Sequence, residues 1–216
     1  MLAQSWFSQH PTLNAVDADP KAAREVVLWY DIKMRIFIWL IYALWLILIT
    51  YLTVSATGVK QETQGHLVQS FGLLFAIIVA FLLPYLPIFH FLNFAPVNPV
   101  LSSFGVLLCA AGMALLVLAR QHLGSNWSQT VAAKIGHQLV TSGPYRYVRH
   151  PMYAGGLVAC IGSAMVCGGA WIFLLVILGA LFLWRVAAED TLMAHQFPNE
   201  YPDYKKRTKA LIPFVW

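Results

Sequence analysis

Residues 151–186 read PMYAGGLVACIGSAMVCGGAWIFLLVILGALFLWRV, and the only charged residue in this run is Arg185. Most of the other side chains are apolar, so the run has the composition of membrane-embedded helices. Near its middle, the Cys167-Gly168-Gly169 step is too short for anything but a tight turn. We therefore predict a helical hairpin with spans at 152–167 and 170–186.

The first helix of this hairpin is short for a membrane span and rich in small residues. Gly155, Gly156, Gly162 and Ser163 all lie within it. Small residues let the backbones of neighbouring membrane helices approach closely. We therefore expect this helix to be buried between its neighbours.

The chain before this hairpin is also poor in charge. No Lys, Arg, Asp or Glu occurs between Arg35 and Lys60, or between Glu62 and Arg120. About 20 mostly apolar residues are needed to cross the hydrocarbon core. The three further spans that these gaps predict are residues 36–55, 66–86 and 97–119.

The composition of all 216 residues supports a membrane protein, with 59% hydrophobic and only 11% charged residues. A soluble domain carries roughly 25% charged residues, and disordered chains are less apolar still. The three cysteines lie in or beside apolar runs, so we interpret them as reduced packing residues. The expected fold class is all-α, a polytopic integral membrane protein with about five transmembrane helices, a cytoplasmic loop and a C-terminal helix.

The charges indicate how such a protein is oriented. The formal net charge is +5, and with five spans the loop at 120–150 and the tail after residue 185 share one side. Both are rich in Lys and Arg, so the positive-inside rule places that side in the cytoplasm. In so apolar a chain the basic residues indicate membrane lipids as partners, not nucleic acid, and residues 205–209 are expected to contact the leaflet. Residues 22–30 are expected to form an amphipathic helix at the interface.

Residues 137–155, HQLVTSGPYRYVRHPMYAG, are rich in histidine, tyrosine and arginine and lie just before an apolar helix. Proline suits the first helical position, and the residue before it is pushed out of the helical region. A helix is therefore predicted to begin at Pro151, with His150 immediately before its first residue. Free amide groups and the helix dipole there favour a carboxylate or another electron-rich group.

The same residue types could instead anchor the protein at the membrane interface. In that interpretation the tyrosines form an aromatic belt and the arginines contact lipid headgroups. The side chains concerned are Tyr145, Tyr147, Tyr153, Arg146 and Arg149. Gly143 and two X-Pro steps favour a binding site over a membrane anchor, because an aromatic belt requires no particular backbone conformation.

A second polar cluster, Arg185-Val-Ala-Ala-Glu189-Asp190, ends the last span. Arg185 and Glu189 are four residues apart, so a simple intrahelical ion pair of about 0.2–0.5 kcal/mol is one interpretation. Charges at a membrane boundary also tend to have a ligand or a partner elsewhere. Both interpretations stay open at this point.

Three stretches together resemble a known family: residues 139–155, the pair Glu189-Asp190, and residues 200–207. They resemble the isoprenylcysteine carboxyl methyltransferase family, integral membrane enzymes that methylate a lipid-linked carboxylate with S-adenosylmethionine. The resemblance covers about the C-terminal half. The whole sequence, 1–216, is expected to form a single membrane domain, with an N-terminal region of two spans (1–96) and a core of three spans, loop and tail (97–216). The resemblance implies that this core is the catalytic part.

The resemblance also implies roles for individual residues. Arg185 is implied to hold the substrate carboxylate, as the catalytic residue. The family's acidic pair is commonly Glu-Glu, so the role of the shorter Asp190 is left open. The residues implied to bind the cofactor are His137, Gln138, Leu139, Val140, Tyr145, His150, Pro151, Met152, Tyr153 and Glu189.

The expected chemistry needs neither a metal nor a general base. Methyl transfer is an in-line displacement, and a carboxylate acceptor is already ionised at pH 7. The seven histidines are scattered, without the spacing of a metal site. The lipophilic acceptor is expected to arrive from the bilayer. Phospholipid amine N-methyltransferases and NADPH-dependent sterol-type membrane reductases look similar in this region and remain alternatives, as does a non-catalytic transporter or scaffold.

Overall fold

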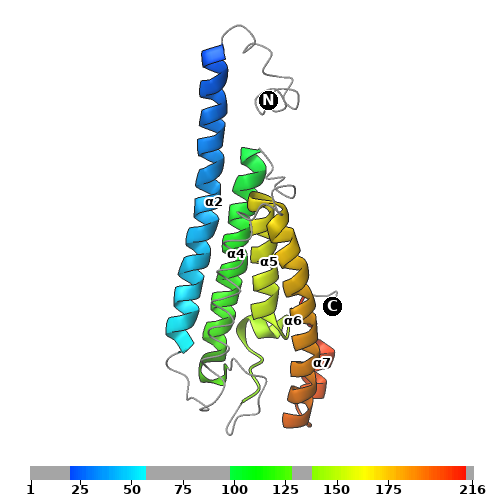
Figure 1. Cartoon of the computed structure of the whole chain (residues 1–216). Helices are drawn as coiled ribbons and strands as arrows, with labels where there is room; N and C mark the ends of the chain where they lie inside the picture. The colour runs from blue at the N-terminus through cyan, green and yellow to red at the C-terminus, as the bar shows by residue number, and fades with distance from the viewer. Residues whose placement is uncertain (1–19, 57–97, 128–137, 213–216) are drawn as a thin grey trace.

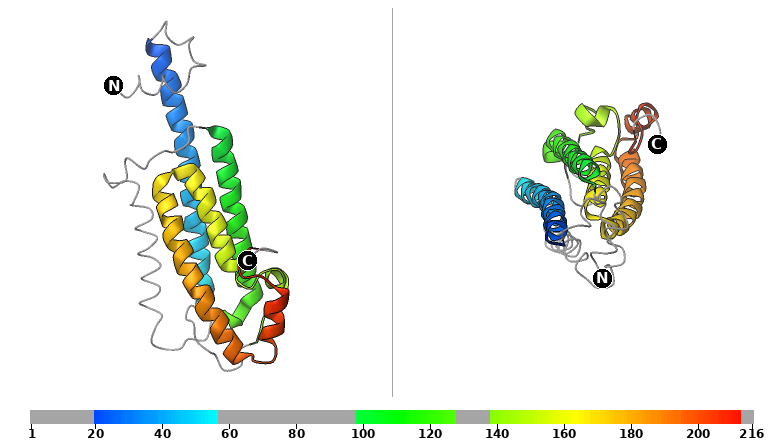
Figure 2. Two further views of the ribbon diagram at one scale, coloured as in Figure 1. Left: turned by 90° about the vertical axis from the view of Figure 1, so that its right-hand side faces the viewer. Right: turned by 90° about the horizontal axis from the view of Figure 1, so that it is seen from above.

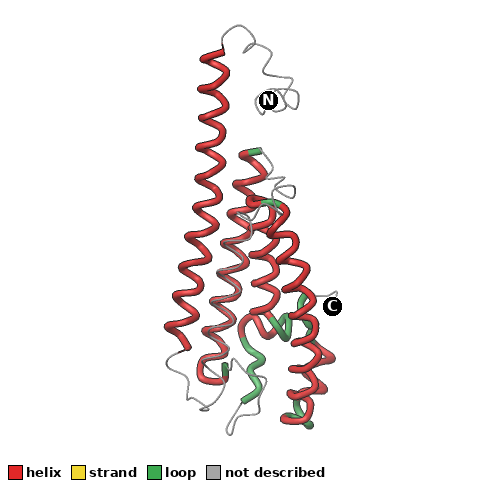
Figure 3. The backbone as a smooth tube through the Cα atoms, viewed as in Figure 1, coloured by secondary structure: helices red, strands yellow, loops and turns green. Residues whose placement is uncertain are grey.

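The computed structural model describes residues 20–56, 98–127 and 138–212, and these residues form a bundle of helices (Figures 1 and 3). The described part contains no strand, and its single isolated bridge joins Val148 to Lys209. Its elements are α2 (Pro20–Ala56), α4 (Pro99–Leu123), η4 (Gly124–Asn126), η5 (Gly143–Arg146), α5 (Pro151–Cys167), α6 (Gly169–Gln196) and α7 (Tyr201–Arg207).

The predicted spans agree with these helices wherever the chain is described. Three helical segments are long and apolar enough to cross a membrane: Arg35–Ser55, Pro99–Asn126 and Trp171–Gln196. The predicted span at 152–167 corresponds to α5, a shorter apolar helix of 17 residues. The predicted span at 66–86 lies outside the described residues. The all-α membrane fold class is confirmed.

Two helices run further than the apolar pattern predicted. The expected interfacial helix at 22–30 is not separate, because α2 continues through it as one helix of 37 residues (Figure 1). No glycine or proline occurs between Lys21 and Ala56 to interrupt it. Likewise, α6 continues past residue 186 to Gln196. The end of an apolar run thus marks where a helix leaves the hydrocarbon core, not where the helix ends.

The most extensive helix contact joins α4 to α5, and glycines make it possible. A Cβ atom added to Gly112 would lie 2.5 Å from the backbone nitrogen of Ala159, and one added to Gly162 would lie 2.4 Å from that of Cys109. These backbones touch at distances that any side chain would prevent. Because α5 also packs against α6 and α2, the prediction that it is buried between its neighbours is confirmed (Figure 2).

Polar contacts attach α2 to this pair of helices. Trp45 Nε1 donates to Ser163 Oγ on α5 at 2.9 Å. At the C-terminal end of α2, the carbonyl of Ser55 accepts a hydrogen bond of 2.7 Å from Nη2 of the buried Arg120 on α4. The guanidinium thereby satisfies a carbonyl at the end of α2 that has no partner within its own helix. The three cysteines are buried and free, as predicted.

We predict that Gly112→Ala destabilises the protein by roughly 1–3 kcal/mol, because the added methyl overlaps the backbone of α5. Gly179→Ala on α6 is the matched control, since an added Cβ there has no atom within 4 Å. The control is expected to be neutral or slightly stabilising, because alanine is the better helix former. Thermal unfolding in detergent checks both variants, and equal melting temperatures would contradict the described packing.

Candidate active site

His150 stands at the start of α5, where the sequence predicted it. Pro151 is the first residue of the helix, and the backbone of His150 is not helical, with φ −124° and ψ 59°. The C-terminal segment fixes this corner, because the amide of Arg149 donates to the carbonyl of Lys209 at 2.8 Å and that of His150 to Ala210 at 3.0 Å. The imidazole is thereby held against α6.

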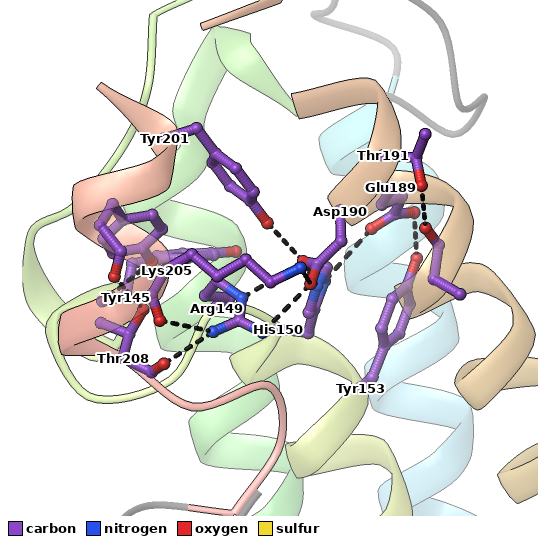
Figure 4. A network of polar contacts seen from close by, with 12 residues as sticks. Tyr145, Arg149, His150, Tyr153, Glu189, Asp190, Thr191, Tyr201, Lys205 and Thr208 are labelled. Carbon is purple, nitrogen blue, oxygen red and sulfur yellow. Dashed lines mark hydrogen bonds and ion pairs between the residues drawn. The ribbon is translucent and has the colours of Figure 1, made fainter. Parts of the chain in front are cut away.

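Asp190 on α6 contacts four residues from two other parts of the chain (Figure 4). Arg149 binds it through two nitrogens, with Nε 3.2 Å from Oδ1 and Nη2 3.1 Å from Oδ2. His150 Nε2 lies 3.0 Å from Oδ1, and Lys205 Nζ lies 3.1 Å from Oδ2. The Tyr201 hydroxyl donates to Oδ1 as well. Asp190 therefore ties the loop before α5 and helix α7 to α6.

Glu189, the neighbouring residue, makes a second set of contacts on the other side of the imidazole (Figure 4). Its Oε2 lies 3.4 Å from His150 Nδ1, and its Oε1 accepts from the Tyr153 hydroxyl. Arg185 Nη2 lies 3.3 Å from Oε1, and its guanidinium carbon is 5.9 Å from the centre of the Tyr153 ring. We call His150, Tyr153, Arg185 and Glu189 the Glu189 cluster.

The two carboxylates differ in exposure. The side chain of Glu189 is 23% exposed and that of Asp190 is 10% exposed. Asp190 also has more protein partners, so its lone pairs are largely occupied. The Asp190 contacts therefore serve to hold the structure, whereas part of the Glu189 side chain stays accessible to solvent.

His150 carries a positive charge more readily than an ordinary histidine. Burial lowers its pKa, but the hydrogen bonds and charges of Asp190 and Glu189 outweigh burial and raise the pKa overall. The geometry leads to the same conclusion, because each ring nitrogen faces a carboxylate oxygen and both nitrogens are donors only in the imidazolium.

The loop that carries Tyr145 is held by the C-terminal segment and by α4. The Tyr204 hydroxyl donates to the backbone carbonyl of the buried Tyr145 at 2.7 Å. Burial raises the pKa of Tyr204 to about 12, so this hydroxyl keeps its proton at physiological pH. Gly143 has φ +60°, and a Cβ there would lie 2.2 Å from the ring of His122 on α4. Both the positive φ and the lack of space for a Cβ atom therefore require glycine at this position.

The structure brings four of the predicted site residues, His150, Tyr153, Arg185 and Glu189, into one cluster. Tyr145 and Pro151 are buried, and Met152 packs against the core formed by α2, α4 and α5. Gln138 is exposed, and its amide donates to Asn126 Oδ1 at 3.2 Å. Within the described chain, no hydrogen bond or ion pair joins 138–140, which include Leu139 and Val140, to the Glu189 cluster. His137 lies outside the described residues.

The interface-anchor interpretation does not account for these contacts. Tyr147 is 60% exposed, as a belt residue would be, but Tyr145 is only 6% exposed. The side chain of Arg149, which that interpretation assigns to lipid headgroups, is 9% exposed and is paired with Asp190. The intrahelical pair of Arg185 and Glu189 is present, as their spacing predicts.

Sequence reasoning did not identify Tyr201 or Lys205 as partners of Asp190. Tyr201 and Tyr204 lie three residues apart and both are buried, while their neighbours on α7 are exposed. That spacing places them on one face of a short helix. Two tyrosines on one face of an otherwise charged helix were the available signal for a helix packed over a polar site.

Replacement of Asp190 tests its structural role. We expect Asp190→Asn to lower stability by about 3 kcal/mol or more, because Arg149 and His150 would remain buried with less compensating charge. Asp203→Asn is the control, since Asp203 pairs with Lys206 on the exposed surface. Thermal unfolding should show a large loss in the first variant and none in the second. Similar small losses in both would contradict the role of Asp190.

The raised pKa of His150 predicts how stability depends on pH. The ion pairs of the imidazolium contribute fully below the ordinary value of 6.5 and are lost as pH rises through the raised pKa of the folded state. The melting temperature of the wild type should therefore exceed that of His150→Gln most at pH 6, and the difference should shrink as pH rises. His195→Gln, on the exposed surface of α6, should give a small difference that does not follow this trend.

Comparison with known proteins places this site in context. The model of the isoprenylcysteine carboxyl methyltransferase family matches residues 105–195. The protein-S-isoprenylcysteine O-methyltransferase of Rattus norvegicus is 35% identical over 127 residues, which cover 53% of this chain and 42% of the relative. That of Saccharomyces cerevisiae is 27% identical over 178 residues, which cover 76% of this chain and 73% of the relative.

A solved structure shares the fold. The structure of the eukaryotic intramembrane Ras methyltransferase, an isoprenylcysteine carboxyl methyltransferase, superposes with a TM-score of 0.53 at 23% identity, over 71% of this chain and 55% of that one. The chain matches less than half the length of the rat relative. The segment that matches the isoprenylcysteine carboxyl methyltransferase family, 105–195, includes all of α5, most of α4 and nearly all of α6, and this match confirms the resemblance seen in the sequence.

Proposed function

We propose that this chain is a membrane methyltransferase that transfers a methyl group from S-adenosylmethionine to the carboxylate of a prenylcysteine-like, lipid-linked acceptor. The observation that carries the proposal is the Glu189 cluster, which places a carboxylate, a guanidinium and an aromatic ring in contact at one end of α5 and α6. The names of the relatives, which are protein-S-isoprenylcysteine O-methyltransferases, support the acceptor class.

The residues of the cluster fit the proposed methyl donor. When bound, S-adenosylmethionine supplies a methyl group on a positively charged sulfur. The exposed face of Glu189 suits the ammonium or hydroxyl donors of such a molecule, and the Tyr153 ring suits a nearby cation. Tyr153 is held in place by stacking, with its ring centre 5.7 Å from that of His150 and 4.8 Å from that of Phe182. The residues proposed to complete the donor site are His137, Gln138, Leu139, Val140, Tyr145, Pro151 and Met152.

Arg185 is the proposed holder of the acceptor carboxylate. A planar guanidinium binds a carboxylate through two parallel hydrogen bonds. Arg185 is also the first charge after the apolar part of α6, and the preceding residue, Trp184, is 70% exposed. A lipid-linked acceptor can therefore present its carboxylate to Arg185 at the membrane boundary while its lipid chain stays in the apolar phase.

The reaction then needs positioning and no proton transfer. A carboxylate oxygen of the acceptor attacks the methyl carbon, the bond from that carbon to sulfur breaks, and its electron pair stays on sulfur. The products are a methyl ester and a neutral thioether. Alignment of two reactants in this way recovers roughly 7–11 kcal/mol of the barrier. Arg185 orients one reactant, while Glu189 and Tyr153 orient the other.

The proposed location of the chemistry is the membrane surface on the cytoplasmic side. The donor is water-soluble and the acceptor is oily, so the two must meet where α5 and α6 reach the interface. The basic residues at 205–209 lie on the same side and support this orientation. In this proposal residues 97–216 form the catalytic core of a single domain, and residues 1–96 add the N-terminal spans.

Two substitutions test the proposal in purified protein reconstituted into vesicles. Transfer of radiolabelled methyl from S-adenosylmethionine to an N-acylated S-farnesylcysteine should be measured. We expect Glu189→Gln to raise the KM for the donor and Arg185→Gln that for the acceptor, each lowering kcat/KM by about 10- to 100-fold.

Glu200→Gln is the matched control, because Glu200 is an exposed acid just before α7 and outside the cluster. It should retain wild-type kinetics. Full activity of both cluster variants would contradict the proposal, and transfer to an amine headgroup instead of the farnesylcysteine would assign the chain to phospholipid N-methylation.

A further inference from the structure

A groove of about 590 Å³ lies between α6 and the C-terminal segment, and Asp190 is among the residues that line it. Its α6 wall includes the apolar Leu183 and Val186. Its other wall includes Lys206 and Lys209. The Glu189 cluster contributes no residue to its lining, so this groove, which we call the basic groove, is distinct from the proposed methyl donor site.

The basic groove is strongly positive. Four cations line it, together with a single carboxylate, that of Asp190. Arg149 and Lys205 are both paired with that carboxylate. Among the described residues, Lys206 forms an ion pair only with Asp203, and because the two side chains are 76% and 70% exposed, this pair is weak. The ammonium of Lys209 has no ion-pair partner among the described residues.

The groove is also amphipathic, because its apolar wall continues the membrane-facing surface of α6. Leu183 is 47% exposed and the adjacent Trp184 is 70% exposed. The apolar part of α6 ends here, at Arg185, which marks the boundary between hydrocarbon and headgroups. The basic groove therefore has its charged wall at headgroup depth and its apolar wall next to the acyl chains.

We propose that the basic groove binds one anionic phospholipid. Its phosphate group would lie between Lys206 and Lys209, and an acyl chain would follow Leu183 along α6. Charge complementarity favours an anionic lipid over a zwitterionic one, and the apolar wall favours a lipid over a free phosphate ion. The inference does not depend on the proposed methyl transfer.

Such a lipid would lie beside the contacts that hold the site together. Arg149 lines the groove and also binds Asp190, which in turn contacts His150. The bound lipid would add its negative charge to a cluster in which Arg149, Lys205 and His150 share two carboxylates. The bound lipid would therefore hold the positively charged C-terminal segment against α6 and raise the stability of the folded protein.

Lipid binding should be measured by native mass spectrometry on the full chain purified in a neutral detergent. The probes are dioleoylphosphatidylglycerol, dioleoylphosphatidylcholine and the soluble headgroup glycerol 3-phosphate. We expect one phosphatidylglycerol to bind more tightly than either of the other two. The double variant Lys206→Gln/Lys209→Gln should weaken its binding by about 30-fold, from the attraction of an anionic headgroup to two lysines.

The matched control is Arg146→Gln/Arg207→Gln, which removes the same charge from two exposed positions outside the groove. It should retain tight binding of a single phosphatidylglycerol. Equal weakening in both double variants would show diffuse attraction to the basic surface and overturn the proposal. Equal affinity for glycerol 3-phosphate would overturn it in favour of a free phosphate site, and equal affinity for phosphatidylcholine would overturn the role of charge. No result depends on methyl transfer activity.

Discussion

One imidazole joins the start of α5 to α6 in the described part of this protein. His150 lies with its two ring nitrogens toward two consecutive carboxylates on α6, those of Glu189 and Asp190. Adjacent residues on a helix point about 100° apart, so one ring reaches both only if the start of α5 is pressed against α6. Pro151 sets where α5 begins, and the glycines between α4 and α5 fix how deeply that helix sits.

Local signals predicted the helices well, while the partners of Asp190 could not be predicted. The proline that begins α5 and the turn at Gly168, with φ +80°, lie within a few residues of what they determine. The i,i+4 spacing likewise marked the pair of Arg185 and Glu189. By contrast, Arg149 lies 41 positions from Asp190 in the chain, and such a contact leaves no periodic trace in a single sequence.

The two neighbouring acids have separate tasks in this account. Asp190 is nearly buried among structural partners, which join the loop before α5 and helix α7 to α6. Glu189 contacts Tyr153 and Arg185, and its side chain is more exposed than that of Asp190. The shorter aspartate suits the structural position, because its carboxylate stays close to α6 while longer side chains reach in from the loop and from α7. The position proposed to face the methyl donor carries the longer glutamate.

The Glu189 cluster is proposed to bind a sulfonium methyl donor, and calorimetric titration of the purified full chain measures that binding without relying on an acceptor. S-adenosylhomocysteine, the product of methyl donation, and NADPH, the cofactor of the membrane reductases that look similar, should be titrated in parallel. We expect saturable binding of S-adenosylhomocysteine with one site per chain and no binding of NADPH. Binding of NADPH alone would rule out a methyl donor site.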